Sequence, residues 1–192
     1  MSHLAVDFLA QLLNTDCGPI LISGPESPDA DSLGACLALQ KILATHGRKS
    51  DVAGDLSYRY TWFPGAEHVI PNAELCTSYT TVVIMDGDRF RLTPEVQQYF
   101  DNAHKTCIVD HHISTETKGY THAWLDTQVS STCEMLLGSL ESWGVTLDKD
   151  LGTLLYAGIV FDTGGFRHSN TTPQTLQLAS QLLAQNINHE KI

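Results

Sequence analysis

The sequence predicts an α/β fold with a mainly parallel central sheet and helices on both faces. Short apolar runs alternate along the chain with segments of helical periodicity, and the runs are apolar at every position instead of every second one. A strand buried on both faces gives such a continuous run, because crossover helices cover both sides of a parallel sheet. At 192 residues the chain is long enough for one such domain, so we expect residues 1–192 to form a single domain.

The first part of the chain is expected to hold two helices and two strands. Residues 4–14 carry apolar positions at helical spacing, and the apolar run at 20–22 predicts a buried strand. Residues 32–46 predict a second helix, which Gly47 ends because glycine readily takes the left-handed conformation found after helices. Residues 52–53 mark the second strand.

The rest of the chain continues the alternation. Apolar runs at 81–85 and 105–109 predict two further strands. Between them Thr93, with Pro94 at the first helical position, begins a helix that we expect to reach Ala103. Three more helices are expected at 131–143, at 149–161 and from Pro173 onward.

Composition and charge exclude several classes of protein. No apolar run is long enough to span a bilayer, and the N-terminus lacks the features of a secretory signal, so we expect a cytoplasmic protein that does not bind membranes. Acidic residues outnumber basic residues 22 to 11, and the formal charge of −11 argues against binding of long duplex nucleic acid. A short phosphorylated substrate stays compatible, because a cation held by carboxylates inverts the local field.

The five cysteines are scattered, and none forms a C-x-x-C pair. Their odd number and spacing argue against a disulfide framework, so we expect buried, reduced thiols. They are Cys17, Cys36, Cys76, Cys107 and Cys133.

Acidic residues follow three of the predicted strands. These are Asp29 and Asp31 after the first strand, Asp86 after the third, and Asp110 with His111 and His112 after the fourth. Ligands bind beyond the carboxyl ends of the strands in an open α/β sheet, so these side chains should converge. Clustered carboxylates repel one another, and a bound cation removes the conflict. Oxygen ligands with an imidazole suit Mn²⁺ or Mg²⁺, with Co²⁺ as a further alternative.

A fourth segment, residues 156–168, adds another carboxylate and a group of phosphate-binding candidates. Asp162 ends an apolar helix, which is an unusual place for an unpaired charge. Gly164 and Gly165 permit close approach of the backbone to an anion, and Arg167 and His168 are suited to contact phosphate.

Each of these features also has a purely structural interpretation. Asp29 and Asp31 are suited to cap the helix that follows, with about even odds for either alone. Asp86 taken alone fits a turn after a strand, and Gly164-Gly165 fits a plain turn. The coincidence of four acidic strand or helix ends favours a metal site over these separate explanations.

The motifs resemble those of the DHH phosphoesterases. Asp110-His111-His112 is similar to the motif that names the family, and residues 28–34, 83–86 and 158–167 resemble its first, second and fourth motifs in family order. The run 162–167 is most similar to the branch of oligoribonucleases (nano-RNases) and 3′-phosphoadenosine-5′-phosphate phosphatases. The resemblance implies a manganese-dependent phosphoesterase or exoribonuclease built on the catalytic domain of that family.

Site residues follow from this resemblance position by position. It implies that Asp86 bridges two metal ions, that one site is completed by Asp31, His111 and Asp162, and that the other uses Asp29. It places His112 near the scissile phosphate, with Asp86 and Arg167 as further catalytic residues. Further substrate contacts are implied at Arg89, Ser130, Ser131, Thr132, Gly164, Gly165 and His168.

Two departures from the family pattern shape these expectations. The first motif of the family begins with a metal-binding histidine, and here Pro25 occupies that position, so we expect one tight metal site and a weak or empty second site. The separate C-terminal substrate-binding domain of the family is absent from these residues. The last residues, 188–192, resemble the beginning of an element, which leaves a truncated chain as one interpretation.

The expected function is hydrolysis of short oligoribonucleotides, dinucleotides or nucleotide phosphomonoesters by a metal-activated water. One alternative is a degenerate module that binds nucleotide without efficient turnover because Pro25 impairs a metal site. Another is an inorganic pyrophosphatase, whose catalytic domain is similar. The substrate polarity and the oligomeric state, including a homodimer, are left open by the sequence.

Overall fold

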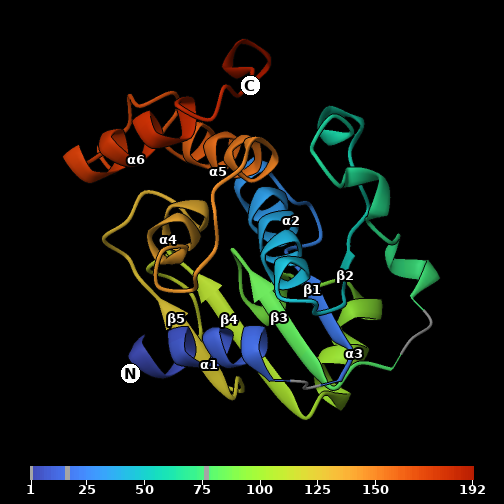
Figure 1. Ribbon diagram of the computed structural model, residues 1–192. Helices are drawn as coiled ribbons and strands as arrows, with labels where there is room; N and C mark the ends of the chain where they lie inside the picture. The colour runs from blue at the N-terminus through green and yellow to red at the C-terminus, as the bar shows by residue number, and fades with distance from the viewer. Residues whose placement is uncertain (1, 16–17, 76–77) are drawn as a thin grey trace.

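A sheet of five parallel strands forms the centre of the protein (Figure 1). The computed structural model describes residues 2–15, 18–75 and 78–192, and the strands and helices below are those of the described residues. The strands are β1 Ile20–Ser23, β2 Ser50–Ala53, β3 Thr81–Met85, β4 Lys105–Asp110 and β5 His122–Leu125, in the spatial order β2-β1-β3-β4-β5. The predicted fold class is confirmed.

Six α-helices surround this sheet. They are α1 Ser2–Asn14, α2 Ala30–Thr45, α3 Pro94–Asn102, α4 Thr132–Ser139, α5 Lys149–Asp162 and α6 Pro173–Leu183. Short 3-10 helices lie in the connections: η1 Tyr58–Tyr60, η2 Ala66–His68, η3 Asn72–Glu74, η4 Arg89–Arg91 and η5 His189–Lys191.

The two faces of the sheet are covered unequally. On one face α1 and α2 pack on the strands, and α4, α5 and α6 extend this layer (Figure 1). On the other face α3 packs through Val96 and Phe100. Successive side chains of a strand point to opposite faces, so Val83 of β3 joins the larger core while Ile84 joins the smaller one. This double burial explains why the strands are apolar at every position.

The strand order places several acidic segments at one edge of the sheet. After β1 the chain moves outward to β2 and then returns to β3 on the other side of β1. Such a reversal opens a crevice beyond the carboxyl ends of the strands. The segments that follow β1, β3 and β4 all reach this edge, as the arrowheads in Figure 1 show.

Most predicted elements are present, with small shifts at their ends. Gly47 is left-handed, with φ of 71°, as predicted. The helix predicted at 131–143 is wrong in its length, because α4 ends at Ser139 and turns follow. Strand β5 was not predicted. It is a short edge strand in which His122 stacks on Phe8 of α1 at 3.9 Å between ring centroids.

Three cysteines of the described residues are free and buried, as expected: Cys36, Cys107 and Cys133. The expectation for Cys17 and Cys76 falls outside the described residues. Among the helices of the described residues, none combines the length and the hydropathy that crossing a membrane requires.

Candidate metal centre

Three carboxylates and one imidazole meet at the carboxyl edge of the sheet. Asp31 comes from the first turn of α2, Asp86 and His111 directly follow β3 and β4, and Asp162 is the last residue of α5. Each contributes one potential ligand atom, and these four atoms all lie within 4.8 Å of one another. The structure thus brings together the four residues that the family resemblance assigned to one metal site.

Backbone groups at the start of α4 hold the Asp31 carboxylate in place. The amide N–H of Thr132 donates to Oδ2 at 2.7 Å, and that of Cys133 donates to Oδ1 at 2.9 Å. Both amides belong to the first turn of a helix, where N–H groups lack partners within the helix and favour a negative charge. Asp31 is fully buried, so its ionised carboxylate must be stabilised by these two donors and by any cation that binds at the site.

The Asp86 carboxylate is directed into the site by an unusual backbone conformation. Its φ is 59°, in the left-handed region that aspartate adopts more readily than most residues. The amide of Asp86 still donates to the carbonyl of Val109 at 2.9 Å, so the chain turns sharply while attached to β4. The Thr132 hydroxyl donates to Asp86 Oδ1 at 3.2 Å.

The imidazole of His111 presents a buried nitrogen to the carboxylates. Its Nε2 lies 2.9 Å from Asp162 Oδ2 and 3.5 Å from Asp86 Oδ1. Among the described residues this nitrogen has no hydrogen-bond partner with acceptable geometry. A buried nitrogen that is aimed between two carboxylates without a directed hydrogen bond is placed to accept a metal ion.

The carboxylates are electrostatically strained without a cation. Burial and then the charge of Asp31 raise the pKa of Asp86 to about 9, and burial and then the charge of Asp162 raise the pKa of Asp31 to about 6. Burial lowers the pKa of His111, but the neighbouring Asp162 and Asp31 outweigh it, so this pKa lies above the ordinary imidazole value. A divalent cation would stabilise every one of these carboxylates in its charged form.

The donor set therefore fits a divalent cation. Three carboxylate oxygens and one imidazole nitrogen suit Mn²⁺ and related ions better than a site built on thiolates. Cys133 is close to Asp31, but burial and the Asp31 charge raise the pKa of its thiol, which disfavours the thiolate that a soft metal requires.

Asp110 and His112 form, together with Asp86 and His111, a second group of potential ligands that overlaps the first. Asp110 Oδ1 lies 2.8 Å from His112 Nδ1 and accepts the amide N–H groups of His111 and His112, and Oδ2 accepts the Thr115 hydroxyl. Burial raises the pKa of Asp110, but the hydrogen bonds from His112 and Thr115 outweigh it and bring this pKa below its ordinary value. Asp110 thus orients His112, whose pKa the same hydrogen bond raises and whose ring is half-exposed at the site.

Asp29 has a clear structural role. It is the N-cap of α2, where Oδ1 accepts the amide N–H groups of Asp31 and Ser32 at 3.0 Å each. It lies outside the two groups of potential ligands found in the described residues, although its charge adds to the rise in the pKa of Asp86. A metal-binding role for Asp29 stays a prediction.

Pro25 is buried next to the turn that carries Asp86. A Cβ placed on Gly87 would lie 3.7 Å from Pro25 Cβ and 3.5 Å from Arg91 Nη1. The amide of Glu26 donates to the carbonyl of Arg91 at 2.7 Å, and the charge of Arg91 acts on His112. Arg91 was missed in the sequence, where nothing distinguished it from Arg89.

The small polar residues before α4 serve mainly its local structure. The Ser131 hydroxyl caps α4 by accepting from the amide of Glu134 at 3.0 Å, and Ser130 donates to the buried Glu134 carboxylate. Thr132 contacts Asp86 directly. Because all three are fully buried, direct substrate contacts by Ser130, Ser131 and Thr132 stay predictions.

The loop after α5 is held around the backbone of Asp162. Asn170 Nδ2 donates to the carbonyls of Asp162 at 3.2 Å and Ser130 at 3.1 Å, and His168 Nδ1 lies 3.1 Å from the Asp162 carbonyl. Gly164 is left-handed with φ of 57°, and a Cβ there would lie 2.4 Å from the His168 ring. Gly165 is also left-handed, and Arg167 donates back to the Gly164 carbonyl.

Arg89, the remaining predicted contact, lies on η4. Its guanidinium packs over the Phe90 ring, 5.0 Å from the centroid, and next to Gly119 in the loop before β5. Glu134 was missed as a supporting residue, and no contact was predicted for Asn170, because the sequence gives no sign of the partners that tertiary structure brings to a polar side chain.

Gly158 provides the close packing that the centre requires. A Cβ at this position would lie 2.4 Å from Cys133 Sγ and 2.5 Å from Asp31 Oδ1. We expect Gly158→Ala to destabilise the protein by about 1–3 kcal/mol through overpacking, measured by urea unfolding. Gly138→Ala, in α4 with nothing within 4 Å of the added Cβ, is the control and should stabilise by about 0.4–1 kcal/mol. Equal effects of the two changes would contradict this packing.

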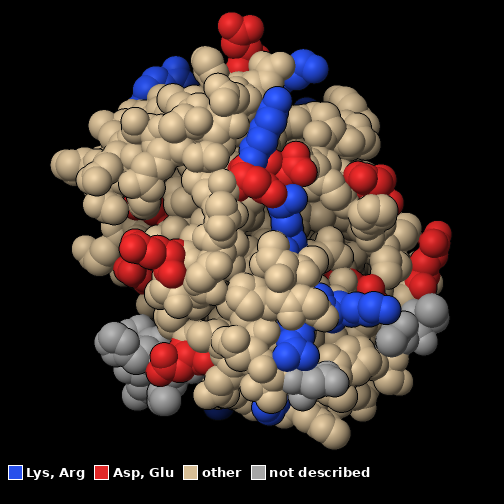
Figure 2. Space-filling view, viewed as in Figure 1, with Lys and Arg blue, Asp and Glu red and all other residues tan. Residues whose placement is uncertain are grey.

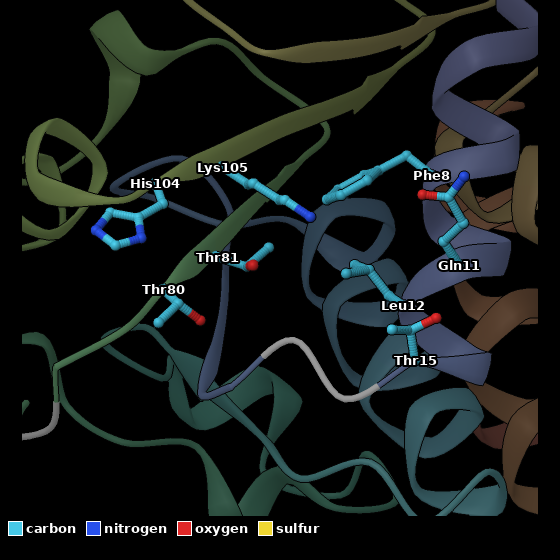
Figure 3. A pocket seen from close by; sticks show the side chains of 8 residues that line it. All are labelled: Phe8, Gln11, Leu12, Thr15, Thr80, Thr81, His104 and Lys105. Atoms are coloured by element: carbon cyan, nitrogen blue, oxygen red, sulfur yellow. The ribbon is translucent and has the colours of Figure 1, made fainter.

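A cavity lies at the amino ends of the strands, opposite the edge that carries the metal centre. It has a volume of about 280 Å³ and is formed by α1 and the first residues of β3 and β4. Figure 3 shows Lys105 extending toward Phe8, with Nζ 5.7 Å from the ring centroid. The amino ends of the strands border this cavity, so it is separate from the metal centre.

Charged side chains of both signs lie on the face that Figure 2 presents. Basic and acidic side chains are interspersed there among the described residues (Figure 2). Lys41, for example, pairs with Asp148 at 3.1 Å and Asp150 at 3.3 Å.

Comparison with known proteins gives a consistent result. The family model described as DHH family, N-terminal domain, matches residues 19–159. A protein of Thermus thermophilus named bifunctional oligoribonuclease and PAP phosphatase NrnA is 28% identical over 182 residues, covering 93% of this chain and 54% of the relative. The Bacillus subtilis protein of the same name is 36% identical over 167 residues, covering 81% of this chain and 50% of the relative. The chain therefore spans about half the length of the curated relatives it matches.

A solved structure has the same fold. An exopolyphosphatase-related protein from Bacteroides fragilis superimposes with a TM-score of 0.87 at 20% identity, covering 98% of this chain and 58% of the other. At this identity the likeness concerns the arrangement of strands and helices.

Proposed function

This chain belongs to the DHH family, and on that basis we propose that it is a metal-dependent phosphoesterase that hydrolyses short oligoribonucleotides, dinucleotides or nucleotide phosphomonoesters such as PAP. The relatives named as oligoribonucleases and PAP phosphatases support this substrate class. The observation that carries the proposal is the convergence of Asp31, Asp86, His111 and Asp162 within 4.8 Å.

The residues of the centre divide into ligands and groups that face substrate. We assign the four convergent residues as ligands of one divalent cation, with Mn²⁺ preferred and Mg²⁺ or Co²⁺ as alternatives. When bound, such a cation lowers the pKa of water and neutralises charge on a phosphate. His112, half-exposed and oriented by Asp110, is placed to donate a proton or hydrogen bond to phosphate oxygen, because its pKa is raised. Arg91 adds a positive charge on the same side.

Activity against a defined set of substrates tests this function. We expect Mn²⁺-dependent release of mononucleotides from a diadenylate and of phosphate from 3′-phosphoadenosine-5′-phosphate (PAP). We expect no release of phosphate from inorganic pyrophosphate. Rapid hydrolysis of pyrophosphate, without hydrolysis of diadenylate or PAP, would establish the pyrophosphatase alternative. Binding of diadenylate without hydrolysis would establish a degenerate module, the alternative that Pro25 favours.

The position of Pro25 predicts one tight metal site. Pro25→His should introduce a ligand beside the turn of Asp86 and raise the stoichiometry of tight Mn²⁺ binding from one to two, measured by calorimetric titration. We expect hydrolysis to rise by about tenfold with the second ion. Pro28→His, on the same loop, is the control and should leave both quantities unchanged. Two equally tight sites in the unmodified protein would contradict the assignment.

We place this activity in the cytoplasm, where short RNA and nucleotide phosphates are available.

A further inference from the structure

A cavity of about 360 Å³ with aromatic walls is lined by residues next in the chain to Asp31 and Asp162. It is formed by the segment around η1, the C-terminal half of α5 with the loop after it, and the last residues of the chain, all in the upper part of Figure 1. The rings of Tyr60, Trp62, Phe63 and Phe161 line it, and Arg59 and Lys191 supply cations at its walls. We call this cavity the aromatic pocket.

The aromatic pocket borders the centre through three of its lining residues. Ala30 lies between Asp29 and Asp31 in the chain, and Gly164 and Gly165 lie two and three residues after Asp162. Tyr60 lies within reach of Asp29, because burial and then the charge of Asp29 raise the pKa of its phenol. The aromatic pocket and the centre are therefore built on the same two segments, the start of α2 and the end of α5 with the loop after it.

Two rings of the aromatic pocket are exposed, and one of them is held by a buried neighbour. Trp62 is 42% exposed and Phe161 is 50% exposed, although both are large and apolar. The buried Phe63 anchors the segment: its ring meets Trp62 edge-on at 4.6 Å and Tyr60 at 5.3 Å between centroids. Rigid aromatic faces that remain accessible to water are suited to stack on a flat aromatic ligand.

We propose that the aromatic pocket binds the nucleobase of the substrate by stacking on Trp62, while the adjacent phosphate lies at the metal centre. This inference rests on the proposed function, because it takes the substrate to be a nucleotide. A base suits this position better than a purely aliphatic group, since every base has a π-face and Arg59 can add a cation–π contact or hold a phosphate. Stacking is tolerant of base identity, so the pocket would select for the presence of a base rather than for one sequence.

Tryptophan fluorescence tests base binding without catalysis. The other two tryptophans, Trp124 and Trp143, are 8% and 7% exposed, so quenching by a solute reports mainly on Trp62. Adenosine, which has no phosphate, should quench the metal-free protein with saturation, and Trp62→Phe should abolish the quenching. Absence of saturable quenching in the unmodified protein would overturn the proposal, whether or not the protein is an enzyme.

Kinetics with matched substrates test the position of the base. Against a diadenylate, Trp62→Ala should raise KM by about tenfold with kcat changed less than twofold, because one stacking contact is lost. Two analogues of the diadenylate each have one of the two adenosines replaced by an abasic residue. Trp62→Ala should leave KM unchanged for the analogue that lacks the stacked base. Tyr58→Ala is the control, since Tyr58 is 80% exposed on the same segment but does not line the pocket.

The outcomes separate this inference from the proposed function. If the unmodified protein hydrolyses diadenylate and Trp62→Ala raises KM equally for all three substrates, the aromatic pocket is not a base site although the enzyme assignment stands. If no substrate is hydrolysed, the proposed function fails and adenosine quenching alone decides the base site. A change in the oligomeric state of Trp62→Ala, with unchanged KM, would identify the pocket as a protein contact and overturn the proposal.

Discussion

Replacing Asp86 with asparagine should abolish hydrolysis and at the same time stabilise the metal-free protein at pH 8. Asparagine tolerates the left-handed backbone at this position and can still accept the Thr132 hydroxyl, so the fold should be retained. The loss of a charged ligand should reduce kcat/KM by at least about a thousandfold, because cation chemistry contributes several kcal/mol to such reactions. Steady-state rates of diadenylate hydrolysis with Mn²⁺ give this value.

The gain in stability has a separate cause. Burial and the charge of Asp31 make ionisation of Asp86 unfavourable in the folded, metal-free protein, and asparagine removes that burden. Thermal unfolding in the presence of a chelator measures the effect. Asp101→Asn, an exposed residue of α3 that accepts only from Gln97 among the described hydrogen bonds, is the control and should change neither quantity. Activity within tenfold of the unmodified protein, or a lower melting temperature for Asp86→Asn at pH 8, would contradict the role of Asp86.

The stability of the metal-free protein should fall as the pH rises from about 4 to about 9. Asp86 has a pKa of about 9 and Asp31 of about 6 in the folded state, against 3.8 as the ordinary value. The folded state therefore binds more protons than the unfolded state in this window, and stability decreases as pH increases through it. The raised pKa values of His111 and His112 act in the same direction, since the stability that they contribute below about pH 6.5 is lost as their folded forms deprotonate.

Asp110 has the opposite sign but acts in another range. Its lowered pKa contributes stability above the ordinary value of 3.8, and this contribution is lost only as the pH falls below that value. The contribution of Asp110 therefore does not offset the fall in stability of the metal-free protein between pH 5 and pH 8.

A bound cation should reverse this dependence. Mn²⁺ binds the deprotonated carboxylates and competes with protons, so it should raise the melting temperature by about 5 °C more at pH 8 than at pH 5. Scanning calorimetry at both pH values, with Mn²⁺ or with a chelator, measures the difference. Asp86→Asn should remove most of it. A stabilisation by Mn²⁺ that is equal at both pH values would show that the buried carboxylates are not the ligands.

The sequence by itself determined the class of fold, the alternation of strands and helices, and the chemistry of the ligand residues. Continuous apolar runs could be assigned to buried parallel strands because double burial removes the need for polar alternation. Acidic residues at the ends of those runs indicated a shared edge, because parallel strands place their carboxyl ends together. Local chemistry was sufficient for the caps as well, and Thr93 begins α3 as predicted.

The tertiary structure decided what each polar residue contacts. Asp29 and Asp31 are two positions apart in one motif, yet the first caps α2 while the second is bound by the amides of α4, about a hundred residues later in the chain. Strand β5 escaped prediction because it is short and of mixed polarity, and its pairing with β4 and packing against α1 stabilise it as a strand.

Proximity between distant segments is likewise a property of the folded chain. Arg91 lies near Pro25 because β1 and β3 are neighbours, and Trp62 lies near Phe161 because a loop after β2 folds over α5. Neither Arg91 nor Trp62 belongs to a pattern in the sequence. The spacing of residues along the chain does not show which side chains meet in the folded protein. The residues that we propose as ligands of a cation could be named from the sequence, and the order of the strands brings their side chains within 4.8 Å of one another.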